Sequence, residues 1–144
     1  MGKETISHSD SHGVLQLIVH ISEKSKSEIL AVSESLGIPP ALARPLLLLG
    51  KPEAMSSLAE HLSCDRSYIT GITDQLEERG LVERISGEDR RVKLLKLTTK
   101  GKNLRNRLAD GIVQESPILN ALSNKERKML LDLLGKLTDK QIVL

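Results

Sequence analysis

Apolar residues recur every three to four positions along most of this chain, which is the spacing of amphipathic helices. The first such stretch runs from about Ser11 to Ser35. Its polar middle, SEKSKSE, indicates either a helix that leaves the core partway or a weak break. Gly37 ends this stretch, and Pro40 is well placed to begin a second helix, ALARPLLLL. Pro45 lies inside that second helix, where its ring predicts a kink or a delayed start.

Two short helices follow, joined by a brief turn. The third helix covers MSSLAEHL, with Ser56 or Ser57 expected as its N-cap and Glu60 at capping-box spacing from Ser57. The fourth covers DRSYITGITDQLEERG, with Asp65 as N-cap and Gly80 as C-cap. Two helices joined in this way form a helix-turn-helix.

The apolar pattern then changes to that of a β-hairpin. LVERI and VKLLKLT are the expected strands, and SGEDRR is the turn between them. Helical spacing returns in TKGKNLRNRLADGIVQES, and Pro117 follows that segment. The order of elements predicts a mainly α chain with a small β-hairpin wing. We expect the segment from about Ser56 to Thr98 to form a winged helix-turn-helix.

A last helix is predicted from Ser123 to about Thr138, with Ser123 and Glu126 spaced as a capping box. The first and last helices carry more leucine and isoleucine than one small winged domain can cover. An unpaired chain would therefore expose a large apolar patch. A homodimer with two-fold symmetry would bury that patch against itself.

Composition limits the class of protein. The 144 residues suit a single domain, residues 1–144, and the 39% of hydrophobic residues suit a soluble core. Phe and Trp are absent, so the core must be aliphatic. The single cysteine excludes an intrachain disulfide and suits a reducing compartment. No apolar run approaches the length of a membrane span, and the N-terminus lacks a signal-peptide core, so we expect no membrane partner and a cytoplasmic location.

Positive charge is concentrated around the hairpin. Residues 84–105 contain eight Lys or Arg and two acids, although the whole chain has a formal net charge of only +2. Arg90 and Arg91 are expected at the hairpin tip, where arginine suits a narrow minor groove of DNA and Asp89 can hold a neighbouring guanidinium by a bidentate pair. Lys93 and later lysines alternate with apolar residues. An edge strand protected from aggregation also explains these lysines well, but it explains the paired arginines less well.

The fourth helix presents a polar face. Ile69, Ile72 and Leu76 share the apolar side, and the opposite side is centred on Ser67, Gly71, Asp74 and Glu78. An ordinary solvated helix is the alternative explanation of this face. If the helix enters a major groove, only its N-terminal half should do so, because Asp74 and Glu78 would repel phosphate. The candidate DNA-binding residues are Arg66, Ser67, Tyr68, Thr70, Gly71, Gln75, Arg90, Arg91 and Lys93.

SSLAEHLSCDRSYITGITDQLEERGLVERISGEDRRVKLLKLTTKG resembles the MarR family of bacterial and archaeal transcription regulators. Its most specific parts are LEERGLVER, the DRR of the wing and LTTKG. The resemblance implies a homodimeric repressor that binds double-stranded DNA at a pseudo-palindromic operator, with a recognition helix at 65–79. It also implies release by a small anionic or phenolic effector, by cysteine oxidation or, occasionally, by metal.

The resemblance also divides the chain. Dimerisation helices are expected at about 11–36 and 103–144, and a DNA-binding lobe at about 38–101 with its wing at 81–98. The chain departs from the family pattern at Gly71, where a basic residue is frequent, and at Pro45. It also lacks the aromatic residues that often line the family's ligand cleft.

Other chemistry receives less support. Cys64 precedes a helix N-terminus, which can activate a thiol, but a small residue packed in a turn is the simpler explanation. The four histidines form no evident metal motif, and no nucleophile motif or phosphate loop is present, so we expect no metal, no cofactor and no enzyme. Two further hypotheses are a winged-helix module that binds an acidic protein instead of DNA and a redox sensor that works through Cys64.

Overall fold

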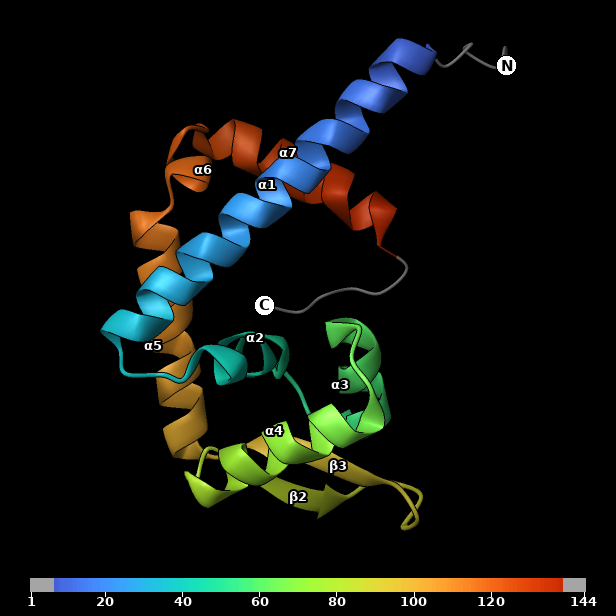
Figure 1. Cartoon of the computed structure of the whole chain (residues 1–144), viewed down its shortest axis with the longest axis vertical. Helices are drawn as coiled ribbons and strands as arrows, with labels where there is room; N and C mark the ends of the chain where they lie inside the picture. Colours follow the sequence, from blue (N-terminus) through green and yellow to red (C-terminus); the bar gives the residue numbers. More distant parts are fainter. Residues whose placement is uncertain (1–6, 139–144) are drawn as a thin grey trace.

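The computed structural model describes residues 7–138 and is mainly α-helical with a small antiparallel sheet (Figure 1). The predicted fold class is therefore confirmed. The ends of the predicted domain, residues 1–6 and 139–144, lie outside the described residues, and so does the end of the predicted dimerisation segment at 103–144. In chain order the elements are α1 (His8–Ser35), α2 (Pro40–Leu48), β1 (Glu53–Ala54), α3 (Met55–Leu62), α4 (Arg66–Glu78), β2 (Val82–Ser86), β3 (Lys93–Leu97), α5 (Thr99–Glu115), α6 (Pro117–Asn120) and α7 (Asn124–Leu137).

Helix α1 is a single helix that runs through the polar stretch SEKSKSE. Of the two predicted alternatives, the weak break is wrong and the helix that leaves the core partway is confirmed. Only the C-terminal part of α1 is buried, at Val32 and Ser33, where it packs along α5 (Figure 1). A Cβ at Gly111 of α5 would lie 2.7 Å from Cγ1 of Val32, so glycine allows this close approach of the two helices.

Helix α2 begins at Pro40 and continues through Pro45, so Pro45 does not delay its start. Proline leaves one carbonyl of the preceding turn without its helical donor. Against that loss, the buried Pro45 ring contributes to the apolar face of α2 together with Leu42 and Leu46. Packing of this face outweighs the local penalty of the proline.

The sheet has three strands in the order β1-β3-β2, and both pairings are antiparallel. The predicted hairpin is confirmed, with Val82 opposite Leu97 and Ser86 opposite Lys93. Strand β1, which the sequence pattern did not reveal, runs directly into α3. The N-cap of α3 is therefore Ala54, without a side-chain hydrogen bond, and the predicted cap at Ser56 or Ser57 is wrong.

The core is aliphatic, as the composition requires. Leu42, Leu46, Leu58, Leu76 and Leu108 are fully buried, and they bring α2, α3, α4 and α5 together over the sheet. Each such leucine stabilises the fold by about 1.5–3 kcal/mol relative to an exposed position. This packing holds α4 by one side only and leaves its other side at the surface.

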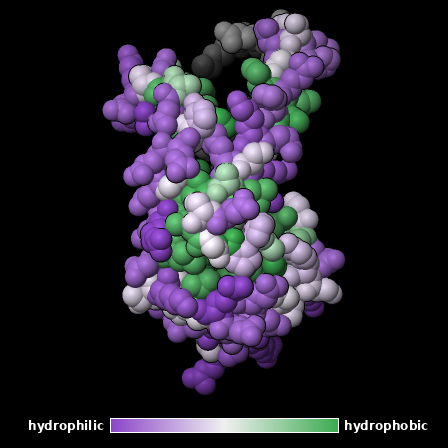
Figure 2. All heavy atoms as spheres, turned by 60° about the vertical axis from the view of Figure 1, so that its left-hand side comes forward, coloured by the Kyte–Doolittle hydropathy of each residue, from purple (hydrophilic) through white to green (hydrophobic). Residues whose placement is uncertain are grey.

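The far end of the molecule from the sheet consists of the N-terminal half of α1 together with α6 and α7 (Figure 1). The predicted capping box of α7 is present, and hydrogen bonds from Ser123 hold the pKa of Glu126 below its usual value. Large apolar side chains on these helices are 44–68% exposed, and hydrophobic residues reach the surface on the upper helices in Figure 2. They are Val14, Leu15, Leu17, Ile18, Val19 and Ile21 on α1, and Met129, Leu131, Leu133, Leu134 and Leu137 on α7.

Candidate nucleic-acid interface

The turn between α3 and α4 is built by backbone and cap interactions. Ser63 adopts a left-handed conformation with φ of 52°, and the backbone N–H of Cys64 donates to the carbonyl of Ala59 at 3.0 Å. Asp65 then caps α4, because its Oδ1 accepts from the backbone N–H of Tyr68 at 2.7 Å. The predicted helix-turn-helix and the predicted recognition helix at 65–79 are both present.

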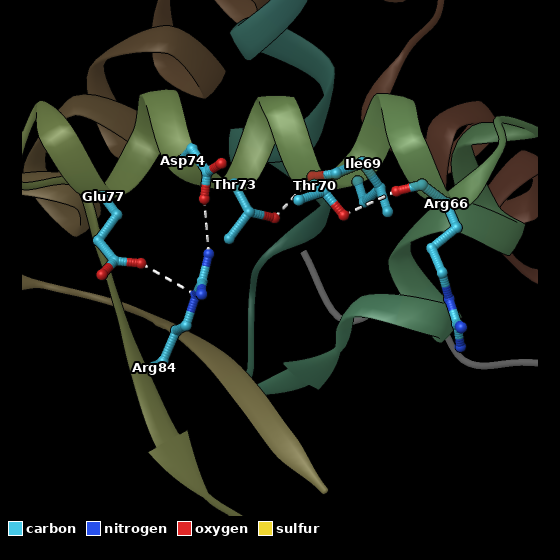
Figure 3. A network of polar contacts seen from close by, with 7 residues as sticks. All are labelled: Arg66, Ile69, Thr70, Thr73, Asp74, Glu77 and Arg84. Carbon is cyan, nitrogen blue, oxygen red and sulfur yellow. Dashed lines mark hydrogen bonds and ion pairs between the residues drawn. The ribbon is translucent and has the colours of Figure 1, made fainter.

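Helix α4 buries Ile69, Ile72, Thr73 and Leu76, as its spacing predicts. The six candidate residues on α4, namely Arg66, Ser67, Tyr68, Thr70, Gly71 and Gln75, are all exposed. The hydroxyl of Thr70 donates to the carbonyl of Arg66 at 2.8 Å (Figure 3). Its oxygen lone pairs remain available to an external donor. The exposed face of α4 therefore offers both donors and acceptors to a partner.

Gly71 lies at the centre of this exposed face. A Cβ added there would meet no heavy atom of the described residues within 4 Å outside the helix's own backbone. Packing within the chain therefore does not require glycine at this position. Because glycine has no Cβ, another molecule can instead approach the backbone of α4 closely at this position.

The acidic half of α4 is covered by an arginine from β2. The Arg84 guanidinium donates through Nη2 to Oδ1 of Asp74 at 2.8 Å and through Nε to Oε2 of Glu77 at 3.0 Å (Figure 3). The sequence pattern places Arg84 in the basic surplus and does not predict this pairing. The available signal was two acids one helical turn apart, followed by an arginine in the strand that packs on the same helix. The pairing offsets part of the negative charge that opposes phosphate.

The hairpin tip carries exposed arginines. Arg90 and Arg91 make no side-chain hydrogen bond or ion pair to any residue in the 7–138 range. The predicted pair between Asp89 and a guanidinium is wrong: Oδ1 of Asp89 accepts from the backbone N–H of Arg91 at 3.0 Å. That carboxylate shapes the turn, and both guanidinium groups stay free. Lys93 is exposed, and its Nζ donates to the hydroxyl of Ser86 across the hairpin at 3.2 Å.

The end of α4 is fastened to the start of α5. The chain reverses after α4 at Gly80, where φ is +70°, and β2 runs back beside the helix. Thr98 then donates through its hydroxyl to the carbonyl of Gly80 at 2.6 Å and through its backbone N–H to the carbonyl of Leu81 at 3.1 Å. Lys100 adds a bond from Nζ to the carbonyl of Arg79 at 2.8 Å. This junction sets the orientation of α4 relative to α5.

Because β2 runs antiparallel to α4, the hairpin tip projects toward the end of the lobe where α4 begins (Figure 1). The structure thus places all nine candidate residues at the surface of one lobe, on α4 and on the hairpin. We call these nine residues the recognition surface.

The other candidate chemistry lies elsewhere. Cys64 is half-buried and packs against the core cluster. The rings of His8 and His12 are 6.4 Å apart on α1, which starts earlier than predicted. Among residues 7–138 there is no group of three or more His, Cys, Asp or Glu side chains that could hold a metal ion. Within the same range no helix is long and apolar enough to cross a membrane.

A helix-turn-helix followed by a β-hairpin, with helices on both flanks, defines a winged helix-turn-helix protein. A family model described as "MarR family" matches residues 51–93. The chain belongs to the MarR family of transcription regulators.

Individual relatives agree with this assignment. The HTH-type transcriptional regulator PapX from Escherichia coli is 32% identical over 95 residues, which are 62% of this chain and 58% of PapX. A regulatory protein from Thauera aromatica is 32% identical over 110 residues, which are 74% of this chain and 66% of that protein. The chain therefore spans about three fifths to two thirds of the length of these curated relatives.

Solved structures match nearly the whole chain. Wild-type MarR from E. coli without ligand is 25% identical, with a TM-score of 0.67 over 93% of this chain and 98% of MarR. NadR in complex with 4-hydroxyphenylacetate is also 25% identical, with a TM-score of 0.73 over 98% of this chain and 100% of NadR. The flanking helices are thus part of the shared architecture.

Proposed function

We propose that this chain regulates transcription by binding double-stranded DNA in a sequence-specific manner through the recognition surface. The observation that carries the proposal is the arrangement on one lobe of an exposed polar helix face and of two arginines whose side chains have no partner among the described residues. The N-terminal half of α4 would enter the major groove. The hairpin tip would reach the adjacent minor groove.

Each part of the recognition surface has a physical role in this proposal. Ser67, Thr70 and Gln75 offer hydroxyl and amide groups that discriminate base edges in a major groove. Arg90 and Arg91 would gain from the enhanced negative potential of a narrow minor groove. Gly71 would let the backbone of α4 approach the DNA. Arg84 would keep Asp74 and Glu77 from repelling phosphate.

We propose that the working unit is a homodimer formed by the exposed apolar residues of α1 and α7. Eleven large apolar side chains at one end of a small chain exceed the scattered exposure normal for a monomer. A two-fold axis through that end would bury them isologously and carry two recognition helices. Helices spaced about 34 Å apart fit successive major grooves, so the operator should be pseudo-palindromic.

We propose that the protein acts as a repressor that a small anionic or phenolic effector releases from DNA. The support is the family membership and the solved complex of NadR, which holds 4-hydroxyphenylacetate. In this chain an effector would act by tilting α5. The hydrogen bond between Thr98 and Gly80 would carry that tilt to α4.

The decisive experiment measures binding to the DNA that flanks the protein's own gene. Fluorescence anisotropy is recorded across a salt series, with a random duplex of equal length as control. Preferential binding with a steep salt dependence supports the proposal. Equal, weak binding to both duplexes contradicts it and favours the alternative module that binds an acidic protein.

A further inference from the structure

A cavity of about 330 Å³ lies where the loop after α2, strand β3 and the N-terminal half of α5 meet. Its lining includes four cationic residues from three separate parts of the chain: Lys51, Lys96, Lys102 and Arg105. Among the described residues, no acid lines it. Leu49 and Leu97, both buried, supply an apolar part of the wall. The recognition surface contributes nothing to this cavity.

The positive charges in this cavity are largely uncompensated within residues 7–138. The side-chain amino groups of Lys51, Lys96 and Lys102 have no hydrogen bond or ion pair to another residue in that range. Nε of Arg105 donates to the carbonyl of Leu47 at 3.3 Å, which fixes the guanidinium and leaves its terminal nitrogens available. The nearby acid Glu53 does not line the cavity, and its Oε2 lies 3.3 Å from Nδ1 of His61.

Two of the four cationic side chains are partly buried, which distinguishes this cluster from an ordinary solvated surface. Lys96 and Arg105 are only partly exposed, so they are held against apolar surface with reduced hydration. Like charges gathered in this way repel one another, and the repulsion is stronger where water is partly excluded. An anion that enters the cavity would relieve the repulsion and form charge-assisted hydrogen bonds with groups already in place.

We propose that this cavity binds a small organic polyanion, a molecule with at least two negative charges on phosphate or carboxylate groups. Its volume lies near the lower end of the range of about 300–1,000 Å³ that is typical of small-molecule sites. The cationic side chains would hold the charged groups, and Leu49 and Leu97 would contact the carbon skeleton. The site touches β3, which leads to the wing, and α5. Any effect on DNA affinity rests on the proposed function, but binding itself does not.

The test is isothermal titration of the full chain with pyrophosphate and, separately, with citrate at constant ionic strength. The two probes distinguish a phosphate site from a carboxylate site. We expect saturable binding of at least one probe with one site per chain. The double variant K51Q/K102Q, which changes two exposed lysines, should weaken that binding about tenfold or more, as expected for lost charge-assisted contacts.

A matched control removes the same charge elsewhere. The double variant K24Q/K125Q changes two exposed lysines that line no part of the cavity, and it should leave the affinity for the probe within about twofold. Equal weakening by both double variants would mean unspecific counter-ion binding and would overturn the proposal. So would a lack of saturable heat with either probe.

DNA binding by the same proteins separates this proposal from the proposed function. If K51Q/K102Q loses the polyanion but still binds operator DNA, the cavity is a small-molecule site. If the parent protein binds the probe but prefers no DNA, the site stands and the proposed function fails. If the parent binds only DNA and K51Q/K102Q weakens it, these lysines contact DNA phosphate and the small-molecule site is wrong.

Discussion

The guanidinium of Arg84 on β2 and the carboxylate of Asp74 on α4 lie 2.8 Å apart, on the C-terminal half of the helix whose N-terminal half we assign to the major groove. Glu77 completes the arrangement at 3.0 Å from the same guanidinium. All three side chains are more than one-third exposed, so their net contribution to stability is small, about 0–1 kcal/mol. Their importance lies in the electrostatic potential that α4 presents to a polyanion.

Replacing Arg84 by Ala should therefore weaken DNA binding more than it destabilises the fold. We expect a loss of affinity of about tenfold at low salt, because two carboxylates become uncompensated near phosphate. The melting temperature should change little. Affinity is measured by fluorescence anisotropy, and R84A/D74N/E77Q should recover most of it. Failure of this triple variant to recover would show that Arg84 itself contacts DNA.

The wing arginines and the helix hydroxyls should give contrasting effects. Arg90→Ala or Arg91→Ala should weaken binding to every duplex and reduce the slope of affinity against salt by about one contact each. Ser67→Ala or Thr70→Ala should instead change the preference between operator variants, by about 1–3 kcal/mol at one base pair. Both sets are measured on a panel of single-base operator variants. An unchanged salt slope in the arginine variants would disprove the role of the wing.

Gly71→Ala separates helix stability from close approach to DNA. The added methyl meets no neighbour in the described chain, so the substitution should stabilise α4 by about 0.5–1 kcal/mol. DNA affinity should nevertheless fall. Gly13→Ala on α1 is the matched control, because that site is also open. Chemical denaturation and anisotropy together decide the outcome, and unchanged DNA affinity in Gly71→Ala would argue against close approach.

Gly101→Ala should have the opposite effect on stability. A Cβ at Gly101 would overlap the carbonyl oxygen of Leu81, at the point where the start of α5 packs against the end of α4. We expect destabilisation by about 2–4 kcal/mol or more, because backbone at both sides must shift. Urea unfolding measures the change, with Gly71→Ala as a glycine substitution of equal size. Parent-like stability would contradict this packing.

Cys64 tests the redox alternative. Because its side chain is half-buried against the core and the chain has no second cysteine, peroxide should leave DNA affinity unchanged. Cys64→Ser should bind DNA like the parent. A fall in affinity after peroxide treatment that Cys64→Ser abolishes would establish thiol sensing instead.

Local signals in the sequence were sufficient for most of the fold. Asp65 was predicted as an N-cap because its residue type suits the position before a helix, and Ser123 because Glu126 follows it at capping-box spacing. Both caps are present. The cap predicted at Ser56 or Ser57 failed because a two-residue strand precedes α3. That strand exists only through pairing with β3, about forty residues later, and no local pattern reveals it.

In the candidate site, too, local features could be predicted from the sequence and long-range contacts could not. Exposure of Arg66, Ser67 and Thr70 was predictable from helical periodicity. The pairing of Arg84 with Asp74 was not, since it depends on how β2 packs against α4. The carboxylate of Asp89 was predicted to pair with a guanidinium, but it accepts from the backbone N–H of Arg91, two residues along the same turn. Local hydrogen bonds of short acidic side chains compete well with long-range ion pairs.

The junction between α4 and α5 also has a mechanical consequence. Thr98 and Lys100 connect the beginning of α5 to the carbonyls that follow α4, and Gly101 brings the two backbones into contact. Helix α5 runs from there to the end of the molecule that holds α1 and α7. Helix α5 therefore connects the two ends of the molecule without a break. A small tilt of α5 at the distant end would be expected to move the DNA-facing helix without unfolding any part of the lobe.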